Sequence, residues 1–275
     1  MLILATVFLL GGTVWAGHIS LNTRYVFPSM ITGDNFSVQV GVTNTGDEAA
    51  YDVIINPMLS DSLITQPLSA GNKLEANASF DGILDVKLRE NITPGEYALI
   101  VLTDYKDANG YSFSSIHIPP EKLLIKKHSN SLVSGSIKEI TLPVDGMEKN
   151  QLMLRNLEEK KHIVKTKLYL PRELYGQDGD ETVILEPRGE QVIDFVLTSK
   201  GALAGSKYVI YALIEYEEDN LHYTSTATGM VSIVETDEQN NIPGYVIMVF
   251  VLAALALFIG YQFIAGKAKG GEETD

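Results

Sequence analysis

The chain has 275 residues, which allows one or two domains. It carries 35 acidic and 21 basic residues, and its formal net charge of −14 argues against binding to nucleic acid or to anionic lipid surfaces. It contains no cysteine, which excludes disulfides, thiolate metal sites and cysteine nucleophiles. Any exported domain in this chain must therefore rely on its hydrophobic core.

Residues 1–16 read MLILATVFLLGGTVWA and predict a signal peptide. An apolar run extends from Leu2 to Leu10, and Val14 and Ala16 stand at the −3 and −1 positions of a cleavage site after Ala16. No Lys or Arg precedes the apolar run, so a buried first strand is the alternative. We expect export, because no polar alternation appears before residue 17.

The segment Ile242 to Ala265 contains no charged residue and predicts a transmembrane helix. At about 1.5 Å per residue it reaches roughly 36 Å, which is enough to cross a hydrocarbon core of about 30 Å. Lys267 and Lys269 follow the segment, whereas acidic residues precede it. The positive-inside rule then places the N-terminus outside the cell membrane and the C-terminus in the cytoplasm. A buried core helix is the alternative.

Within this span, the small residues Ala253, Ala256 and Gly260 fall on one side of the helix. Faces of small residues let transmembrane helices pack closely, so we expect lateral association through this face. Ordinary membrane composition is the alternative.

Between the two apolar ends, the apolar residues recur with a period of two and show almost no helical period. In the segment from Asn35, for example, Phe36, Val38, Val40 and Val42 alternate with polar or small residues, which is typical of a half-buried strand. Turn residues separate many short segments of this kind. The pattern predicts antiparallel β-sandwiches.

The same strand occurs twice in the chain. TPGEYALIVLTDY (residues 93–105) and LAGSKYVIYALIEY (residues 203–216) place Tyr97 and Tyr208 111 positions apart, and Asn156 follows Asn44 by 112. After the second asparagine, Glu158 stands at the position that corresponds to Gly46, which predicts a different turn there. The repeat predicts two tandem sandwiches, each large enough to bury its own core.

The predicted order of segments runs from an exported N-terminus to a cytoplasmic tail. The fold class is an all-β ectodomain of two tandem immunoglobulin-like (Ig-like) sandwiches plus one C-terminal transmembrane α-helix. The segments are a signal peptide (1–16), a membrane-distal sandwich (17–127), a membrane-proximal sandwich (128–234), an acidic stalk (235–241), the span (242–265) and the tail (266–275). The residues from Pro119-Pro120 to Asn130 read as an exposed joint.

Gly95-x-Tyr97 followed by apolar alternation resembles the tyrosine corner of Ig-like domains, in which the tyrosine bonds back to the upstream chain. Tyr208 matches less well, because two residues separate it from Gly205. A second pattern resembles CARDB-type adhesion-related domains. It consists of Val40, Val42, Asn44, Gly46, Ala49 or Ala50, and Val53, followed by Pro94, Gly95 and Tyr97. That resemblance implies a prokaryotic cell-surface protein, often S-layer-associated in archaea. The order of signal, Ig-like domain and single span is also similar to the β subunit of the translocon-associated complex, which has one such domain.

Catalytic and metal-binding patterns are absent from the sequence. The five histidines, His18, His117, His128, His162 and His222, show no metal-ligand spacing and read as scattered surface residues. Asp178, Asp180 and Glu181 form either a weak calcium loop or, as we expect, a solvated acidic loop. We therefore expect no enzyme activity, no cofactor and no metal.

Three N-x-[ST] acceptors, Asn35, Asn77 and Asn91, lie in the first predicted sandwich. Pro94 follows the third acceptor sequence and reduces its use, so we predict glycosylation at Asn35 and Asn77 in a host that has the machinery.

The sequence favours a non-catalytic, membrane-anchored cell-surface protein that serves adhesion, envelope architecture or binding of a protein or glycan partner. The alternative is an accessory subunit of a membrane complex such as a translocon or an exporter. Neither reading names the ligand.

Overall fold

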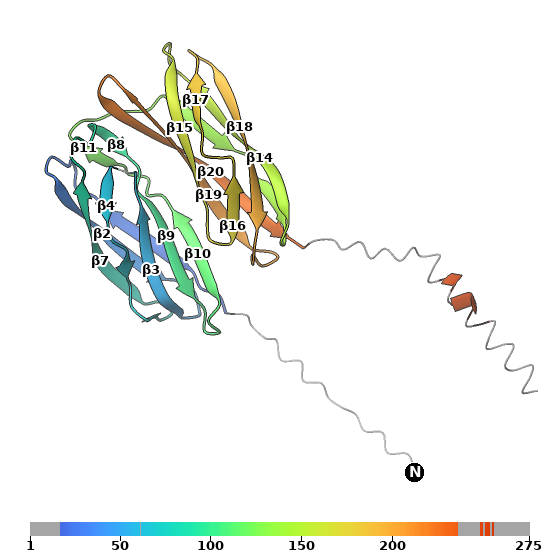
Figure 1. Cartoon of the computed structure of the whole chain (residues 1–275). Helices are drawn as coiled ribbons and strands as arrows, with labels where there is room; N and C mark the ends of the chain where they lie inside the picture. Colours follow the sequence, from blue (N-terminus) through green and yellow to red (C-terminus); the bar gives the residue numbers. More distant parts are fainter. Residues whose placement is uncertain (1–16, 61, 236–247, 250, 254, 256–275) are drawn as a thin grey trace, which may run out of the picture. The chain divides into compact units, whose positions relative to one another are not determined.

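The computed structural model describes residues 17–60, 62–235, 248–249, 251–253 and 255 (Figure 1). Up to Val234, the described residues form strands joined by turns and loops, so the all-β prediction is confirmed for this part of the chain. The strands make four sheets in which nearly all pairs are antiparallel. The exceptions are two parallel pairings made by the last strand and one isolated bridge.

The first half of the chain builds two of the sheets. One has the order β1 (Leu21–Val26), β2 (Asn35–Asn44), β7 (Ser79–Leu88), β4 (Leu63–Thr65). The other has the order β10 (Ser112–His117), β9 (Ile100–Lys106), β3 (Ala50–Met58), β5 (Leu68–Ser69), with β6 (Lys73–Leu74) also on β3. Their inward side chains, among them Val38, Val40, Val53 and Leu99, form one buried core. We call this sheet pair the first sandwich.

The second half repeats the arrangement. One sheet has the order β12 (Val133–Ile137), β14 (Met147–Asn156), β18 (Glu190–Ser199), β16 (Leu174–Gln177). The other contains β20 (Leu221–Val234), β19 (Lys207–Glu218), β15 (His162–Tyr169) and β17 (Thr182–Leu185), with β13 (Ile140–Pro143) parallel to β20. A second core, which includes Leu152, Phe195 and Ile210, lies between them. We call this pair the second sandwich.

Both sandwiches have the strand order of an Ig-like fold. In each, the first, second and fifth main strands and a short fourth strand share one sheet, and the third, sixth and seventh share the other. The predicted repeat is visible strand by strand, because β14 and β19 occupy in the second sandwich the places of β2 and β9 in the first.

The two related asparagines close equivalent turns. Asn44 is fully buried, and its Nδ2 donates to the carbonyls of Glu48 (2.7 Å) and Leu74 (3.2 Å), while its Oδ1 accepts from the N–H of Gly46 (3.0 Å). Buried polar side chains are stable only when they are bonded in this way.

Asn156 makes the same bonds in the second sandwich. Its Nδ2 donates to the carbonyls of Lys160 (2.6 Å) and Glu186 (3.0 Å), and its Oδ1 accepts from the N–H of Glu158 (2.9 Å). The turns after Asn44 and Asn156 therefore have the same hydrogen bonds, and the prediction of a different turn is wrong in this respect. Glycine is needed at 46 because a Cβ there would lie 2.2 Å from the carbonyl oxygen of His18, which packs on this turn.

Replacing Asn156 with Ala is expected to lower the free energy of unfolding by about 3 kcal/mol, because several buried backbone groups lose their partner. Urea denaturation measures the change. Gln151→Ala, an exposed position on the same strand, should change stability by less than about 0.5 kcal/mol. Equal effects of the two substitutions would contradict a structural role for the buried amide.

The two sandwiches contact each other through the outer faces of one sheet each. Ala98, Ile100, Leu102 and Ile116 from the first pack against Tyr169 and Leu213 from the second, and all six are buried. Met58, Ile118 and Tyr211 are partly buried against them. These nine residues are called the inter-sandwich cluster below.

The inter-sandwich cluster repeats the internal symmetry of the chain. Three pairs of its residues are 111 positions apart, which is the offset between Tyr97 and Tyr208. They are Met58 and Tyr169, Ile100 and Tyr211, and Leu102 and Leu213. The two copies therefore meet through equivalent surfaces, as the subunits of an isologous dimer do.

Polar contacts fix both ends of this contact. At one end the N–H and Oγ of Ser114 donate to the carboxylate of Glu173 (2.9 and 2.8 Å), and Arg172 Nε lies 2.7 Å from Asp104 Oδ1. Burial raises the pKa of the Asp104 carboxyl, and the Arg172 guanidinium opposes that shift. At the other end β8 (Gly95–Tyr97) meets His222 of β20, and β11 (Leu123–Ile125) pairs with β8.

These contacts show that β9 and β19 run in opposite directions, because the start of β9 lies near the end of β19. The chain enters near Gly17, which lies against Glu48, and Glu48 in turn accepts from Ala108 in the β9–β10 turn. It leaves after Val234, beside the start of β19. Both ends of the described β-structure therefore lie at one end, which we call the chain-terminal end. The opposite end is called the far end.

The sequence predicts one membrane-distal and one membrane-proximal sandwich. The face-to-face contact places residues of both sandwiches at each end of the β-structure, and the order of the sandwiches relative to a membrane stays a prediction. The joint also differs from a simple exposed linker. Leu123, Leu124 and Ile125 are buried, and Ser129 is buried while Lys126 to His128 are exposed.

The predicted signal peptide, most of the stalk, most of the span and the tail lie outside the described residues. Of the predicted helix-packing face, Ala253 is described and is helical and exposed, whereas Ala256 and Gly260 are outside. Among the residues that the structure describes, no helix has the length and apolarity that a membrane crossing needs.

Candidate functional site

Three polar side chains converge at the far end of the second sandwich. Glu158 stands in the turn after β14, His162 is the first residue of β15, and Glu218 is the last residue of β19. One ligand atom of each lies within 4.8 Å of the others, and within the described residues this is the one group of three or more His or acidic side chains that could hold a metal ion. We call these three residues the His162 cluster.

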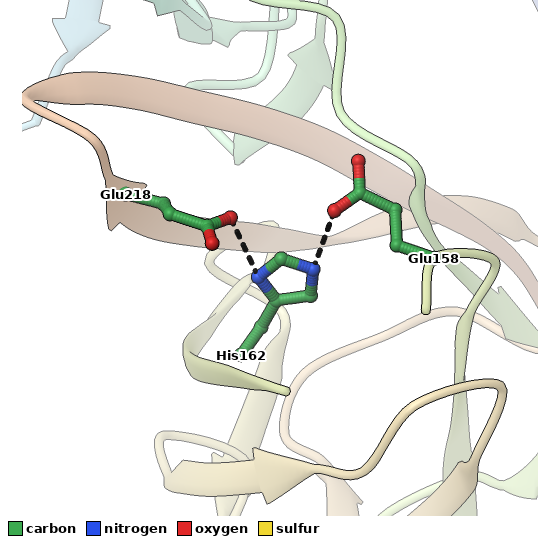
Figure 2. Close-up of side chains that lie close together, drawn as sticks. All are labelled: Glu158, His162 and Glu218. Carbon is green, nitrogen blue, oxygen red and sulfur yellow. Dashed lines mark ion pairs between the residues drawn. The ribbon is translucent and has the colours of Figure 1, made fainter. Parts of the chain in front are cut away.

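Figure 2 shows the imidazole of His162 between the two carboxylates. Its Nε2 lies 2.8 Å from Glu158 Oε2, and its Nδ1 lies 3.2 Å from Glu218 Oε2. The His162 side chain is 1% exposed, whereas those of Glu158 and Glu218 are 26% and 25% exposed. The ring is thus buried, and the carboxylates connect it to solvent.

Neighbouring groups complete the surroundings. Lys160 Nζ lies 3.3 Å from Glu218 and 3.4 Å from Asp219, and the hydrogen bond to Glu218 is the largest cause that raises the pKa of the Lys160 amine. The ring of Tyr216 packs on His162 at 4.6 Å between centroids. The carboxylates of Glu158, Glu218 and neighbouring Asp219 therefore outnumber the one ammonium group, that of Lys160, that pairs with them among the described residues.

The first sandwich lacks this cluster. Gly46 and Ala50 occupy the places of Glu158 and His162, at the offset of 112 set by the two asparagines. Ala50 is fully buried. The fold therefore accepts a small apolar side chain where the second sandwich buries a histidine.

The prediction that all five histidines are surface residues is wrong for two of them. His162 and His222 are 3% and 6% exposed. Sequence spacing could not reveal the His162 cluster, because Glu218 belongs to a strand that is distant in sequence. The alignment of Asn44 with Asn156 could have revealed that His162 is buried, because it pairs His162 with Ala50, an alanine of the first core.

His222 lies at the contact between the sandwiches. Its ring stacks on Tyr97 with centroids 3.9 Å apart, its Nε2 lies 3.0 Å from Thr224 Oγ1 and 3.2 Å from Glu215, and its carbonyl accepts from the hydroxyl of Ser129. These contacts indicate that His222 has a structural role.

The two tyrosines named from the sequence differ in their surroundings. Tyr97 is buried, and its hydroxyl donates to the carbonyl of Thr93 four residues upstream (2.7 Å). Burial raises its pKa above the usual range of tyrosine. Tyr208 is half-buried against the second core, and burial raises its pKa to about 12.

The three predicted glycan acceptors, Asn35, Asn77 and Asn91, are all exposed. Asn77 lies at the chain-terminal end, where its N–H donates to the carbonyl of Asn44. Asn35 begins β2 at the far end, and Asn91 stands in the turn that leads to β8. Their use stays a prediction.

The acidic loop at Asp178, Asp180 and Glu181 is tied to the neighbouring strand. Asp180 accepts from the N–H of Leu168 (2.8 Å), and Thr166 Oγ1 donates to the carbonyl of Gly179 (3.1 Å). These bonds tie the loop to β15, and the solvated acidic loop stays a prediction.

No protein-family model matches the chain, and no curated protein matches it. Among solved structures, a Porphyromonas gingivalis W83 protein of unknown function is similar over 77% of this chain and 99% of its own, at 14% identity and a TM-score of 0.31. The PapD-like domain 7 of human CEP192 covers 44% of this chain and 99% of its own, at 12% identity and a TM-score of 0.32. Escherichia coli alpha-2-macroglobulin covers 78% of this chain and 17% of its own, at 10% identity and a TM-score of 0.31. Similarity at this level does not indicate a function. The Ig-like assignment rests on this chain's own strand order.

Proposed function

We propose that this chain is a non-catalytic cell-surface protein, anchored by its predicted C-terminal span, that presents the far end of its two sandwiches to a protein or glycan partner outside the cell. The resemblance to CARDB-type domains supports adhesion or envelope architecture as the role. The predicted signal peptide and the charges that flank the span support the orientation.

The observation that carries the proposal is the position of Gly17 and Val234 at one end of the β-structure. An anchor that follows Val234 would hold this end toward the bilayer. The loops at the far end, which include Lys122, Lys160 and Asp219, would then face outward from both sandwiches at once. Rigid sandwiches commonly place binding loops at their ends.

The inter-sandwich cluster supports presentation of the two sandwiches as one unit. Two domains joined by a flexible linker would offer two independent surfaces, whereas a buried apolar contact fixes their loops relative to each other. A partner could then contact both sandwiches without a large entropic cost of ordering them.

The test is protease treatment of intact cells that express the chain with a C-terminal tag. We expect loss of the 17–235 portion, while a short tagged fragment stays protected until the membrane is opened. A tag that is digested on intact cells would contradict the orientation.

The same cells, extracted in mild detergent, separate the two roles. A surface protein is expected to be recovered alone or with other surface components. Stoichiometric co-purification with polytopic membrane proteins would instead support the accessory-subunit role and would contradict independent presentation.

A further inference from the structure

We propose that the His162 cluster binds one transition-metal ion of the Zn²⁺ type. The ligands are His162 Nε2 and a carboxylate oxygen of Glu158, and Glu218 accepts a hydrogen bond from His162 Nδ1–H. This site is independent of the proposed surface role.

The buried imidazole of His162 has a nitrogen without a hydrogen-bond partner. His162 Nε2 is inaccessible to solvent and makes no hydrogen bond, although Glu158 Oε2 lies only 2.8 Å away. A short contact without hydrogen-bond alignment leaves the nitrogen unsatisfied, and buried polar atoms in that state are rare and costly. A metal ion between Nε2 and the carboxylate would satisfy both groups.

The equivalent position in the first sandwich is apolar. Ala50 fills the equivalent place in the first sandwich and is fully buried, so the fold does not require a polar side chain there. A buried histidine is destabilising unless it is bonded, compared with the apolar residue that the other copy uses. The turn in the second copy also carries Glu158 in place of Gly46, so both ligand-type residues are present in the second copy and both are missing from the first.

The donor set selects the class of ion. Imidazole nitrogen suits zinc and its neighbours, whereas calcium and magnesium take oxygen ligands. In a tetrahedral zinc site with bonds of about 2.0–2.1 Å, two ligand atoms are about 3.3 Å apart. Widening the 2.8 Å contact by roughly half an ångström would therefore admit the ion, and the partly exposed Glu158 side chain can move by that amount.

The surroundings supply the outer shell. Glu218 Oε2 lies 3.2 Å from Nδ1, on the side of the ring away from Glu158, which is the carboxylate–histidine–metal arrangement that orients zinc-bound imidazoles. The backbone N–H of Glu158 is held by Asn156, whereas its side chain is partly exposed and can adjust, and the remaining coordination positions are open to water. Lys160 pairs with Glu218 and Asp219 and does not contact Glu158 or His162 within ion-pair distance.

The test uses the full-length chain in detergent micelles. Equilibrium dialysis against ZnCl₂ is expected to find one bound equivalent per chain. Co²⁺ in place of Zn²⁺ is expected to give the visible absorption of a nitrogen- and oxygen-ligated ion, which added Zn²⁺ should remove.

Matched variants locate the site. His162→Ala, which matches the residue of the first sandwich, and Glu158→Gln are each expected to weaken Zn²⁺ binding at least tenfold, and Glu218→Gln about tenfold. Glu159→Gln is the control, because Glu159 is the neighbouring carboxylate and pairs with Arg188 instead (2.9 Å); it should leave the affinity within about twofold.

Two outcomes would overturn the proposal. One is the absence of a stoichiometric Zn²⁺ equivalent in the wild-type chain. The other is unchanged binding in Glu158→Gln, whose altered side chain is partly exposed and leaves the fold testable by denaturation.

Discussion

Replacing Leu213 with Asp is expected to separate the two sandwiches. Leu213 is 2% exposed, yet it points away from the core of its own sandwich and into the inter-sandwich cluster. A carboxylate there would be buried against Ile100 and Leu102 without a partner. Because a buried Leu→Ala change alone costs about 2–5 kcal/mol and an unpaired charge adds to it, we expect a loss of about 4 kcal/mol or more.

Urea denaturation checks this result. We expect the variant to show an earlier transition in which the sandwiches come apart or unfold separately. Trypsin should then cut at Lys126 or Lys127, which are exposed beside the buried strand β11.

Ile163→Asp is the matched control. Ile163 lies on the outer face of the same sheet as Leu213, but it is 62% exposed because the first sandwich does not cover it. Its replacement should cost less than about 1 kcal/mol. Equal destabilisation by the two substitutions would mean that the outer face of this sheet is not covered as described.

Replacing Gly95 with Ala should have the second largest effect. Gly95 has a φ of +149°, and an added Cβ would lie 2.1 Å from the carbonyl oxygen of His222. That atom belongs to backbone, so either β8 or β20 must shift. The shift would break the bond from His222 N–H to the carbonyl of Pro94 (2.8 Å) and the stacking of Tyr97 on His222.

We expect Gly95→Ala to cost about 3 kcal/mol or more, combining backbone strain with overpacking. Gly110→Ala separates the two causes, because Gly110 has a φ of +83° and open space around its Cα. Backbone strain alone costs about 1–2 kcal/mol there. Thermal or urea unfolding of both variants measures the difference, and a Gly95 effect no larger than that of Gly110 would contradict the close approach of β8 and β20.

The sequence was sufficient for the strands and for the repeat. Alternation places Val38, Val40 and Val42 inward, and the structure has all three buried in one core. The Asn44–Asn156 offset identified equivalent strands, because a buried amide that closes a turn keeps its position in both copies. These features depend on local periodicity and on turn chemistry, which a single sequence carries.

The contact between the sandwiches could not be read from the sequence. Ile100 and Leu102 belong to the run Ala98–Leu102, in which every residue is apolar, so alternation does not say which face is outward or that this face is also buried. A strand covered on both faces gives the same pattern as a central strand of a larger core. The position of Leu213 has the same ambiguity.

The His162 cluster was missed for a different reason. Its members come from two strands and a turn that only the three-dimensional fold brings together, and spacing rules for metal ligands apply within one local segment. The contrast between His162 and Ala50 was present in the alignment of the two copies. That contrast indicates a buried histidine only once Ala50 is known to be buried.

A double-mutant cycle between Ser114 and Glu173 tests the face-to-face contact of the sandwiches most directly. The two side chains belong to different sandwiches, both are buried, and Ser114 Oγ donates to Glu173 Oε2 at 2.8 Å. Ser114→Ala, Glu173→Ala and the double variant, measured by urea denaturation, should give a coupling energy of about 1–3 kcal/mol. A coupling energy of zero within error would show that these sandwiches do not meet through the faces described.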